Sequence, residues 1–229
     1  MAVEHLPPAR QLAPSRAETD GGQRIGLFGG TFDPIHYGHL VIAEDARVYL
    51  GLDTVYFAPA YQPPHKPEGT YSSFEHRVRM VELAIKSNPR FALSLIETRL
   101  PVPSYTVDTV RAFRRELPAD ATLYFIMGMD SLANILTWHK PEELLPLCRI
   151  VVAERAGYQV DIAALDSKLP GLRKSLELID TPELSISSTG LQRRIRRGLS
   201  VRYQLPMRVE QYVRRQNLYG GNTGADPAR

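Results

Sequence analysis

The stretch RIGLFGGTFDPIHYGH, residues 24–39, decides the fold of this chain. Its mainly apolar start, residues 24–28, runs into a pair of glycines, and this pattern predicts a short buried strand that ends in a turn. A helix is predicted from about Gly38 to Leu50. The stretch therefore places a glycine-containing loop between a strand and the start of a helix, where free backbone N–H groups favour an anion.

The rest of the central chain alternates strand and helix patterns. Runs of apolar, β-branched and aromatic residues predict further strands at residues 54–58, 91–96, 122–127, 149–153 and 176–180. Helices are predicted at residues 74–85, 106–117, 131–136 and 142–147, with two more near the C-terminus, the second beginning at Pro206. We expect an α/β fold, a Rossmann-like doubly wound and mostly parallel sheet with helices on both faces and a C-terminal helical segment. Ligands bind such sheets beyond the carboxyl ends of the strands, near the topological switch point.

The composition is that of a soluble globular protein. Of the 229 residues, 43% are hydrophobic and 23% are charged, which excludes a disordered or collagen-like chain. The single cysteine, Cys148, cannot form an internal disulfide, so we expect a reducing compartment and a cytoplasmic location. No apolar run reaches the roughly 18 residues of a membrane span. We expect residues 1–22 and 220–229 to be disordered and residues 23–219 to form one domain.

Positive charge is concentrated toward the C-terminus. Residues 187–229 contain nine arginines and only two acidic residues, whereas residues 1–186 contain 19 basic and 23 acidic residues. The arginines at positions 193, 194, 196 and 197 form a cluster of a kind that contacts nucleic-acid backbones, binds the phosphates of a small ligand or simply faces solvent. No recognised nucleic-acid-binding motif accompanies the cluster, so we do not expect a nucleic-acid partner.

Two histidines give the loop after the first strand its chemical interest. His36 and His39 are three residues apart, so in the first turn of a helix they face the same side and can both donate hydrogen bonds to a phosphoryl group. Gly38 between them is expected to leave room for a bulky ligand, and the Gly29-Gly30 pair lets a phosphate approach the main chain. The loop is neither a Walker A loop nor a G-x-G-x-x-G loop. Taken singly, these features also fit an ordinary turn, a metal-binding pair or surface residues.

The order of these residues resembles a known signature. Residues 30–39 match the pattern G-x-F-D-P-x-H-x-G-H, the form of the nucleotidyltransferase H-x-G-H signature that is found in bacterial nicotinate-mononucleotide adenylyltransferases. The resemblance extends over about residues 24–219 and implies an enzyme of NAD biosynthesis. It implies that His36 and His39 are catalytic and contact the α- and β-phosphates of ATP. The same ATP site is expected to include Gly29, Gly30, Thr31 and Phe32.

A second segment resembles the same family. Ile186-Ser187-Ser188-Thr189 before a basic helix is similar to the signature I-S-S-T-x-[IL]-R, which implies that Ser187, Ser188 and Thr189 bind ATP phosphates at a helix start. The arginine of that signature falls on Gln192. Arg193 is therefore the expected phosphate-binding arginine, with Gln192 itself and Arg196 as the alternatives.

Four residues are expected to bind the second substrate. By resemblance, Lys66 of the Pro63-Pro64-His65-Lys66 loop lies near the substrate phosphate, and Thr106 lies at the pyridine end of the mononucleotide. The resemblance also implies that Asp130, which follows a buried strand, lies beside the bound nucleotide. It implies in addition that Trp138 stacks on the cationic pyridinium ring. The alternatives are a solvated lysine, helix caps at Thr106 and Asp130, and a packing role for Trp138.

The resemblance implies a direct adenylyl transfer. The 5′-phosphate of nicotinate mononucleotide attacks the α-phosphorus of ATP in line, without a covalent enzyme intermediate, and gives nicotinate adenine dinucleotide and pyrophosphate. Mg²⁺ is expected as the cofactor, carried by ATP rather than held by protein ligands. Nicotinamide mononucleotide, or another small phosphate such as phosphopantetheine, is the alternative acceptor, and a non-catalytic nucleotide or nucleic-acid binder is the alternative of another class. The expected partners are ATP and nicotinate mononucleotide, with no membrane, and a homo-oligomer is compatible with the sequence.

Overall fold

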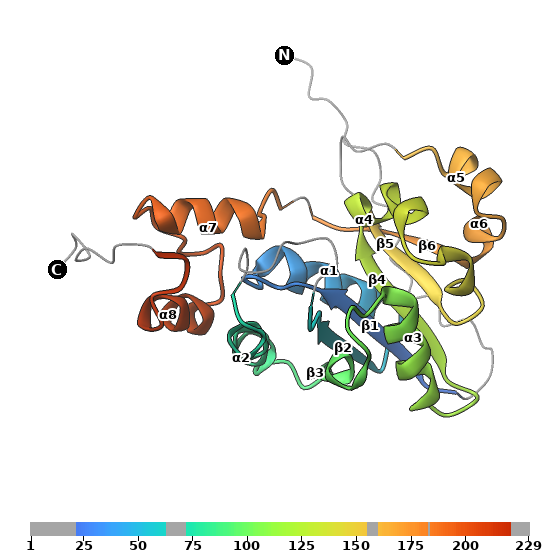
Figure 1. Cartoon of the computed structure of the whole chain (residues 1–229), viewed down its shortest axis with the longest axis horizontal. Coiled ribbons are helices and arrows are strands. Elements are labelled where there is room, and N and C mark those ends of the chain that lie inside the picture. Colours follow the sequence, from blue (N-terminus) through green and yellow to red (C-terminus); the bar gives the residue numbers. More distant parts are fainter. Residues whose placement is uncertain (1–21, 63–71, 155–159, 183, 221–229) are drawn as a thin grey trace, which may run out of the picture.

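The computed structural model describes residues 22–62, 72–154, 160–182 and 184–220 (Figure 1). Its strands are β1 (Arg24–Gly30), β2 (Thr54–Pro59), β3 (Phe91–Leu93), β4 (Thr122–Gly128), β5 (Arg149–Glu154) and β6 (Leu176–Asp180). Its α-helices are α1 (Tyr37–Leu50), α2 (Phe74–Ile85), α3 (Thr106–Arg115), α4 (Met129–Ala133), α5 (Ile162–Lys168), α6 (Leu172–Ser175), α7 (Ser188–Arg196) and α8 (Met207–Arg215). Short 3₁₀ helices lie at η1 (Ile96–Arg99), η2 (Ile135–Thr137), η3 (Pro141–Glu143) and η4 (Leu218–Gly220).

The strands form a single parallel sheet in the order β3-β2-β1-β4-β5-β6. From β1 the chain builds outward through β2 to β3, and it then returns to the other side of β1 to build β4, β5 and β6. The direction of winding therefore reverses between β1 and β4, where Phe28 lies opposite Ile126. This strand order is that of the Rossmann fold, and the predicted doubly wound parallel sheet is confirmed.

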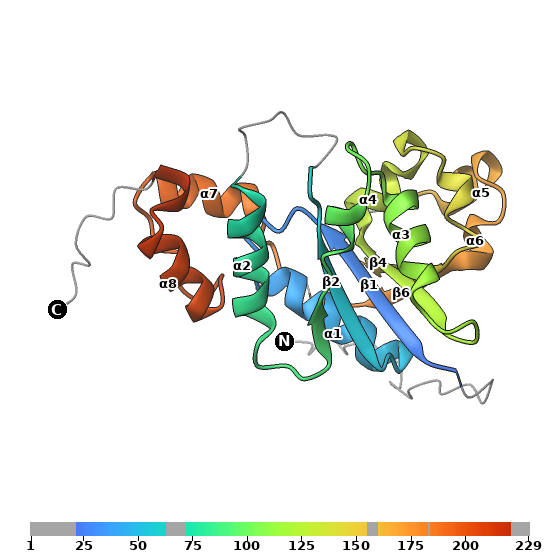
Figure 2. The same cartoon turned by 60° about the horizontal axis from the view of Figure 1, so that its bottom comes forward.

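The sheet separates two hydrophobic cores. Leu27 and Phe125 point into the core that is covered by α3, α4 and α6, and their neighbours Phe28 and Ile126 point into the core that is covered by α1, α2 and α8. Alternation with a period of two residues is what a strand buried on both faces requires. Figure 2 shows α1 and α3 on opposite sides of the sheet, so the helices cover both faces as predicted.

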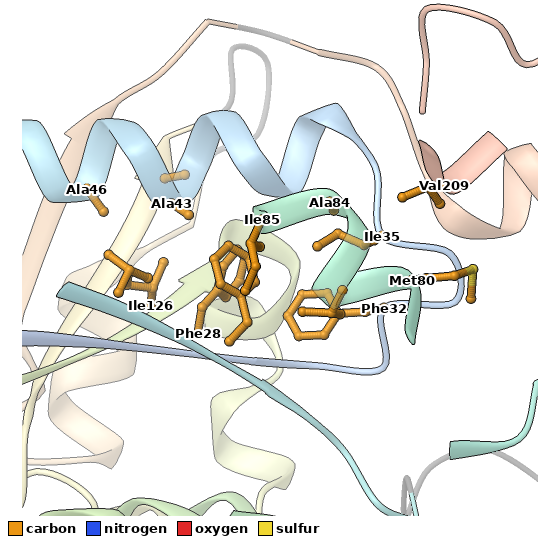
Figure 3. Packing of buried hydrophobic residues seen from close by; sticks show 14 of the residues in the cluster. Phe28, Phe32, Ile35, Ala43, Ala46, Met80, Ala84, Ile85, Ile126 and Val209 are labelled. Carbon is orange, nitrogen blue, oxygen red and sulfur yellow. The ribbon is translucent and has the colours of Figure 1, made fainter. Parts of the chain in front are cut away.

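The C-terminal helices extend the second of these cores beyond the sheet. Val209 of α8 packs into the same cluster as Met80 of α2, and Phe32 and Ile35 from the loop after β1 join them with exposed fractions of 2% and 0%. Figure 3 shows Phe32, Ile35, Met80 and Val209 gathered at this end of the core. The loop after β1 is therefore held from two sides, by the sheet and by the C-terminal helices.

Several elements differ from the predicted ones. The strand predicted at residues 91–96 ends at Leu93, and Pro206 precedes α8 rather than forming its first turn. The helix predicted at residues 142–147 is reduced to η3. Helices α5 and α6 were not predicted, because helices of seven and four residues are too short to show a 3.6-residue period. Within the described parts of the chain, no helix combines the length and the hydropathy needed to cross a bilayer.

Candidate active site

A cleft of about 610 Å³ opens at the carboxyl ends of β1 and β4, the switch point of the sheet. Its volume is within the usual range for a small-molecule site. The predicted site residues that line it are Gly29, Gly30, Thr31, Phe32, His36, His39, Thr106, Asp130, Trp138, Ser187 and Ser188. Residues that are distant in the sequence thus meet in one place. Lys66 lies outside the described residues.

His36 and His39 lie at the start of α1 and contact one another. His36 is the residue before the helix, and its backbone N–H donates a hydrogen bond to Nδ1 of His39 over 3.2 Å. The two rings stack with their centroids 3.7 Å apart and their planes inclined by 26°. The spacing of the two histidines in the sequence predicted that they share one face, and the structure places both on the wall of the cleft.

Both histidines are neutral near pH 7. Burial lowers the pKa of His36 to about 4. Burial, and after it the neighbouring His36 ring, holds the pKa of His39 well below 6.5. Because Nδ1 of His39 accepts the His36 N–H, the proton of the neutral His39 ring is on Nε2. His39 can therefore donate a hydrogen bond without carrying a charge.

Gly38 has a second role besides the one its place in the sequence suggested. A Cβ atom at this position would lie 3.0 Å from Nδ1 and 3.1 Å from Cε1 of His36. Gly38 lines the cleft, as expected, and its lack of a side chain also makes room for the His36 ring. The glycine is needed because the ring folds back over the first turn of α1.

The glycine pair at the end of β1 is packed against aromatic rings. A Cβ at Gly29 would lie 3.2 Å from the ring of Phe125, and a Cβ at Gly30 would lie 3.0 Å from the ring of Phe32. Both contacts are tighter than normal van der Waals separation. The packing of these rings therefore requires small residues here, and the approach of a phosphate to this main chain stays a prediction.

Asp33 ties the loop after β1 to the C-terminal segment. Its buried carboxylate accepts hydrogen bonds from the Tyr219 hydroxyl over 2.6 Å, from Nε2 of Gln192 over 3.0 Å and from the Ser72 N–H over 3.1 Å. Gln192 also donates to the Asp33 carbonyl over 2.6 Å. Burial, reinforced by the adjacent Asp33, raises the pKa of Tyr219, so this tyrosine remains a donor. The loop between β1 and α1, called the histidine loop below, is thereby fixed by hydrogen bonds from three segments that are distant in the sequence.

The start of α7 faces the cleft. Oγ of Ser187 accepts a hydrogen bond from the Gly190 N–H over 3.1 Å, and the Ser188 hydroxyl donates to the Pro34 carbonyl over 2.9 Å. Both serines line the cleft, whereas Thr189 is not among its lining residues. The second signature segment therefore meets the first one through the Ser188–Pro34 hydrogen bond.

The arginines of α7 are arranged differently from the expectation. Gln192 is buried and engaged with Asp33, so its side chain does not face the cleft. Arg193 does not line the cleft either. It lines a neighbouring hollow of about 820 Å³ with the other arginines of the cluster, and this hollow shares Ile186 and Ser187 with the cleft. Arg196 donates to Oε1 of Gln192 over 3.3 Å.

The opposite end of the cleft is walled by aromatic residues. The ring of Tyr105 stacks on that of His139 with centroids 4.2 Å apart, and Trp138 meets Phe125 edge to face at 6.3 Å. Thr106 is the first residue of α3. Tyr105, not Thr106, takes the capping position before α3, so the alternative of a helix cap at Thr106 is wrong.

Asp130 also differs from its alternative interpretation. It is the second residue of α4, and Gly128 takes the capping position before that helix. A role as the helix cap is therefore excluded for Asp130. Its position on the cleft wall is consistent with a place beside a bound nucleotide.

Two charged residues at the site were not predicted. Arg77 is fully buried and donates to the carbonyl oxygens of Thr31, Ala60 and Ser72, over 3.1, 2.7 and 3.1 Å. Its place among the apolar positions 74, 78, 81 and 85 of the predicted helix was a signal that could have shown its burial. Glu97 is buried and lines the cleft, and no motif pointed to it.

The chain is similar to proteins of one group. The family described as cytidylyltransferase-like matches residues 27–194. A protein of Thermomicrobium roseum named "Probable nicotinate-nucleotide adenylyltransferase" is 43% identical over 196 residues, which is 86% of this chain and 91% of that protein. A protein of Moorella thermoacetica with the same name is 44% identical over 200 residues, with the same two coverages. The solved structure of Plasmodium falciparum nicotinic acid mononucleotide adenylyltransferase complexed with NaAD shares the fold, with a TM-score of 0.73 at 22% identity over 88% of this chain and 100% of that one.

Proposed function

Because this chain belongs to the family of nicotinate-nucleotide adenylyltransferases, we propose that its cleft joins ATP and nicotinate mononucleotide. The chain is a nucleotidyltransferase of NAD biosynthesis, and the products are nicotinate adenine dinucleotide and pyrophosphate. The observation that carries the proposal is the stacked, neutral pair His36 and His39 on the wall of a cleft at the switch point of the sheet.

The reaction needs positioning more than proton transfer. An oxygen of the mononucleotide 5′-phosphate forms a bond to the α-phosphorus of ATP, the bond from that phosphorus to the bridging oxygen breaks, and pyrophosphate leaves with the electron pair. The attacking phosphate is already ionised near pH 7, so no general base is required. Nε2–H of His39 is a preorganised donor for the oxygens on which charge develops. His36 shares that wall of the cleft.

The ATP site is proposed to run from the loop after β1 to the start of α7. Gly29, Gly30, Thr31 and Phe32 form one wall, and Ser187, Ser188 and Thr189 lie at a helix start that favours phosphate. Because the hollow that contains Arg193 adjoins the cleft at Ser187, a triphosphate that extends past this serine would reach Arg193. Most of the C-terminal positive charge then serves a small phosphate ligand and solvent rather than nucleic acid.

The mononucleotide is proposed to bind at the aromatic end of the cleft. Trp138 would stack on the pyridinium ring, and Asp130, which also lines the cleft, would lie beside the nucleotide. The backbone N–H groups at Thr106 open a helix, a place that favours the carboxylate of nicotinate over an uncharged carboxamide. Lys66 is proposed to neutralise the substrate phosphate.

Mg²⁺ is proposed to enter with ATP. Over the described residues, no group of three or more His, Cys, Asp or Glu side chains is arranged to hold a metal ion. Mg²⁺ usually keeps several water ligands and binds through substrate phosphates with one or two carboxylates, and Asp130 is a carboxylate on the wall of the cleft. When bound, the ion would neutralise charge on the polyphosphate.

We propose a cytoplasmic location and one domain over residues 23–219. The buried free thiol of Cys148, whose pKa is raised to about 12 by burial, fits a protein that lives without disulfides. Disorder was expected for residues 1–22 and 220–229; Gly22 is described and Gly220 is the last residue of η4, so the proposal is kept for residues 1–21 and 221–229, which lie outside the described residues, and rests on composition. A homo-oligomer remains compatible with these proposals.

Release of pyrophosphate tests the proposed function. Purified protein with ATP and Mg²⁺ is assayed with nicotinate mononucleotide and, in parallel, with nicotinamide mononucleotide. Release that depends on nicotinate mononucleotide, with a clearly higher kcat/KM than for the nicotinamide form, is expected. Higher kcat/KM for nicotinamide mononucleotide would contradict the acceptor, and no release with either would contradict the reaction.

A further inference from the structure

Glu97 is a buried carboxylate on the cleft wall that the proposed reaction does not use. It lies in η1, with an exposed fraction of 8%. Its Oε2 accepts hydrogen bonds from the Tyr61 N–H over 3.2 Å and from the Ser104 hydroxyl over 2.5 Å. Its Oε1 accepts a hydrogen bond from the Thr109 hydroxyl. A buried charge is costly unless donors surround it, and this carboxylate has three of them.

These three donors belong to segments that meet at the aromatic end of the cleft. Tyr61 follows β2, Ser104 precedes α3, and Thr109 lies in the first turns of α3. Ser104 and Thr109 stand on either side of Thr106, the proposed contact of the pyridine ring. Anchoring both neighbours to one carboxylate therefore fixes the start of α3 relative to the cleft.

We propose that Glu97 is a positioning residue for the mononucleotide. Through its hydrogen bonds, the Glu97 carboxylate fixes the start of α3, which includes Tyr105 and Thr106. This places α3 at the distance from Trp138 that the pyridine ring needs. The inference rests on the proposed function, because it assigns the pyridine ring to this end of the cleft. The proposed ATP site lies at the histidine loop and α7. We therefore expect the loss of Glu97 to weaken binding of the mononucleotide and not of ATP.

The surroundings of Glu97 allow a sharp conservative replacement. In Glu97→Gln, the amide oxygen can take the place of Oε2 and accept from Tyr61 and Ser104. The amide NH₂ then faces the Thr109 hydroxyl, which can turn to donate to the Tyr105 carbonyl, 3.3 Å away. All partners remain satisfied although the charge is lost. Glu97→Ala removes all three hydrogen bonds.

The test measures KM for each substrate and kcat for both variants, with Glu142→Gln as a control that removes one exposed carboxylate outside the cleft. Glu97→Ala is expected to raise KM for nicotinate mononucleotide about tenfold or more, a factor that corresponds to about 1.4 kcal/mol. KM for ATP should stay within about twofold. Glu97→Gln and Glu142→Gln should keep both KM values within about twofold to threefold of wild type.

Three results would overturn the inference. The first is an unchanged KM for the mononucleotide in Glu97→Ala, and the second is an equal rise of the KM values for both substrates in that variant. The third is a folded Glu97→Gln that is as impaired as Glu97→Ala, because this would assign the effect to charge. If Glu97→Ala does not fold, Ser104→Ala replaces it, with an expected rise of about threefold in the same KM; no rise would overturn the inference. Failure of wild-type protein to release pyrophosphate would instead reject the proposed function.

Discussion

Replacing Gly38 with alanine tests whether the contact with the His36 ring is the reason that this position requires glycine. The backbone at Gly38 does not have a positive φ, so alanine is sterically allowed there, and in a helix it is favoured by about 1 kcal/mol over glycine. The new Cβ, however, would lie 3.0 Å from Nδ1 and 3.1 Å from Cε1 of His36, about half an ångström inside normal contact. Overpacking of this kind costs about 1–3 kcal/mol.

The two contributions decide what the experiment should show. Their difference leaves Gly38→Ala destabilised by only about 0–2 kcal/mol, so the protein stays folded. The clash is relieved most easily by rotation of the His36 ring away from His39, which it now stacks on at 3.7 Å. We therefore expect kcat to fall at least tenfold, toward the roughly 100-fold loss seen when one transition-state donor is removed.

A double-mutant cycle isolates the contact. Denaturant unfolding and steady-state pyrophosphate release are measured for wild type, Gly38→Ala, His36→Asn and the double variant; asparagine keeps a good helix cap but has no ring. With the ring absent, the alanine should cost no further kcat and should recover about 1 kcal/mol of stability. Full kcat in Gly38→Ala, or an equal loss of kcat in both backgrounds, would refute the reasoning.

Four further outcomes are expected. His39→Ala should lower kcat about 100- to 1,000-fold with an unchanged circular dichroism spectrum, and near-wild-type turnover would remove His39 from the mechanism. Trp138→Ala should raise KM for the mononucleotide about 2- to 30-fold, as loss of a cation–π contact predicts, and an unchanged KM would make Trp138 a packing residue. Tyr219→Phe should lower the free energy of unfolding by about 1–3 kcal/mol, because buried Asp33 loses a donor, while Tyr203→Phe at an exposed tyrosine should change little. Burial lowers the pKa of His36 from 6.5 to about 4, so between these pH values the unfolded chain binds a proton more readily than the folded protein. The free energy of unfolding should therefore fall by up to about 3 kcal/mol as the pH is lowered through this range. In His36→Gln, the free energy of unfolding should depend less on pH. The same pH dependence in the variant and in wild type would contradict the lowered pKa of His36.

The fold could be predicted from the sequence because most of its strands and helices show a characteristic pattern within a few consecutive residues. Strands buried on both faces appear as apolar runs, and the β1–α1 junction carries its own glycines and histidines. These patterns correctly indicated the parallel sheet and the placement of His36 and His39 on one face, whereas the strand order and the position of the switch point came from the structure. The cleft then formed where the carboxyl ends of parallel strands must meet.

Other features depended on contacts between distant residues. Gln192 was one of the alternatives to Arg193 as the phosphate-binding residue, yet it donates to Asp33, 159 residues away, and Tyr219 donates to the same carboxylate across 186 residues. Arg193 lies one position further along α7, which turns it toward the neighbouring hollow instead of the cleft. The hydrogen-bond partners of Arg77 and Glu97 likewise come from loops that the sheet brings together. The sequence by itself therefore determined the order of elements and the chemistry of the histidine loop. Only the tertiary structure decided which polar side chains support that loop from behind, because a hydrogen bond between distant segments leaves no periodic trace in either of them.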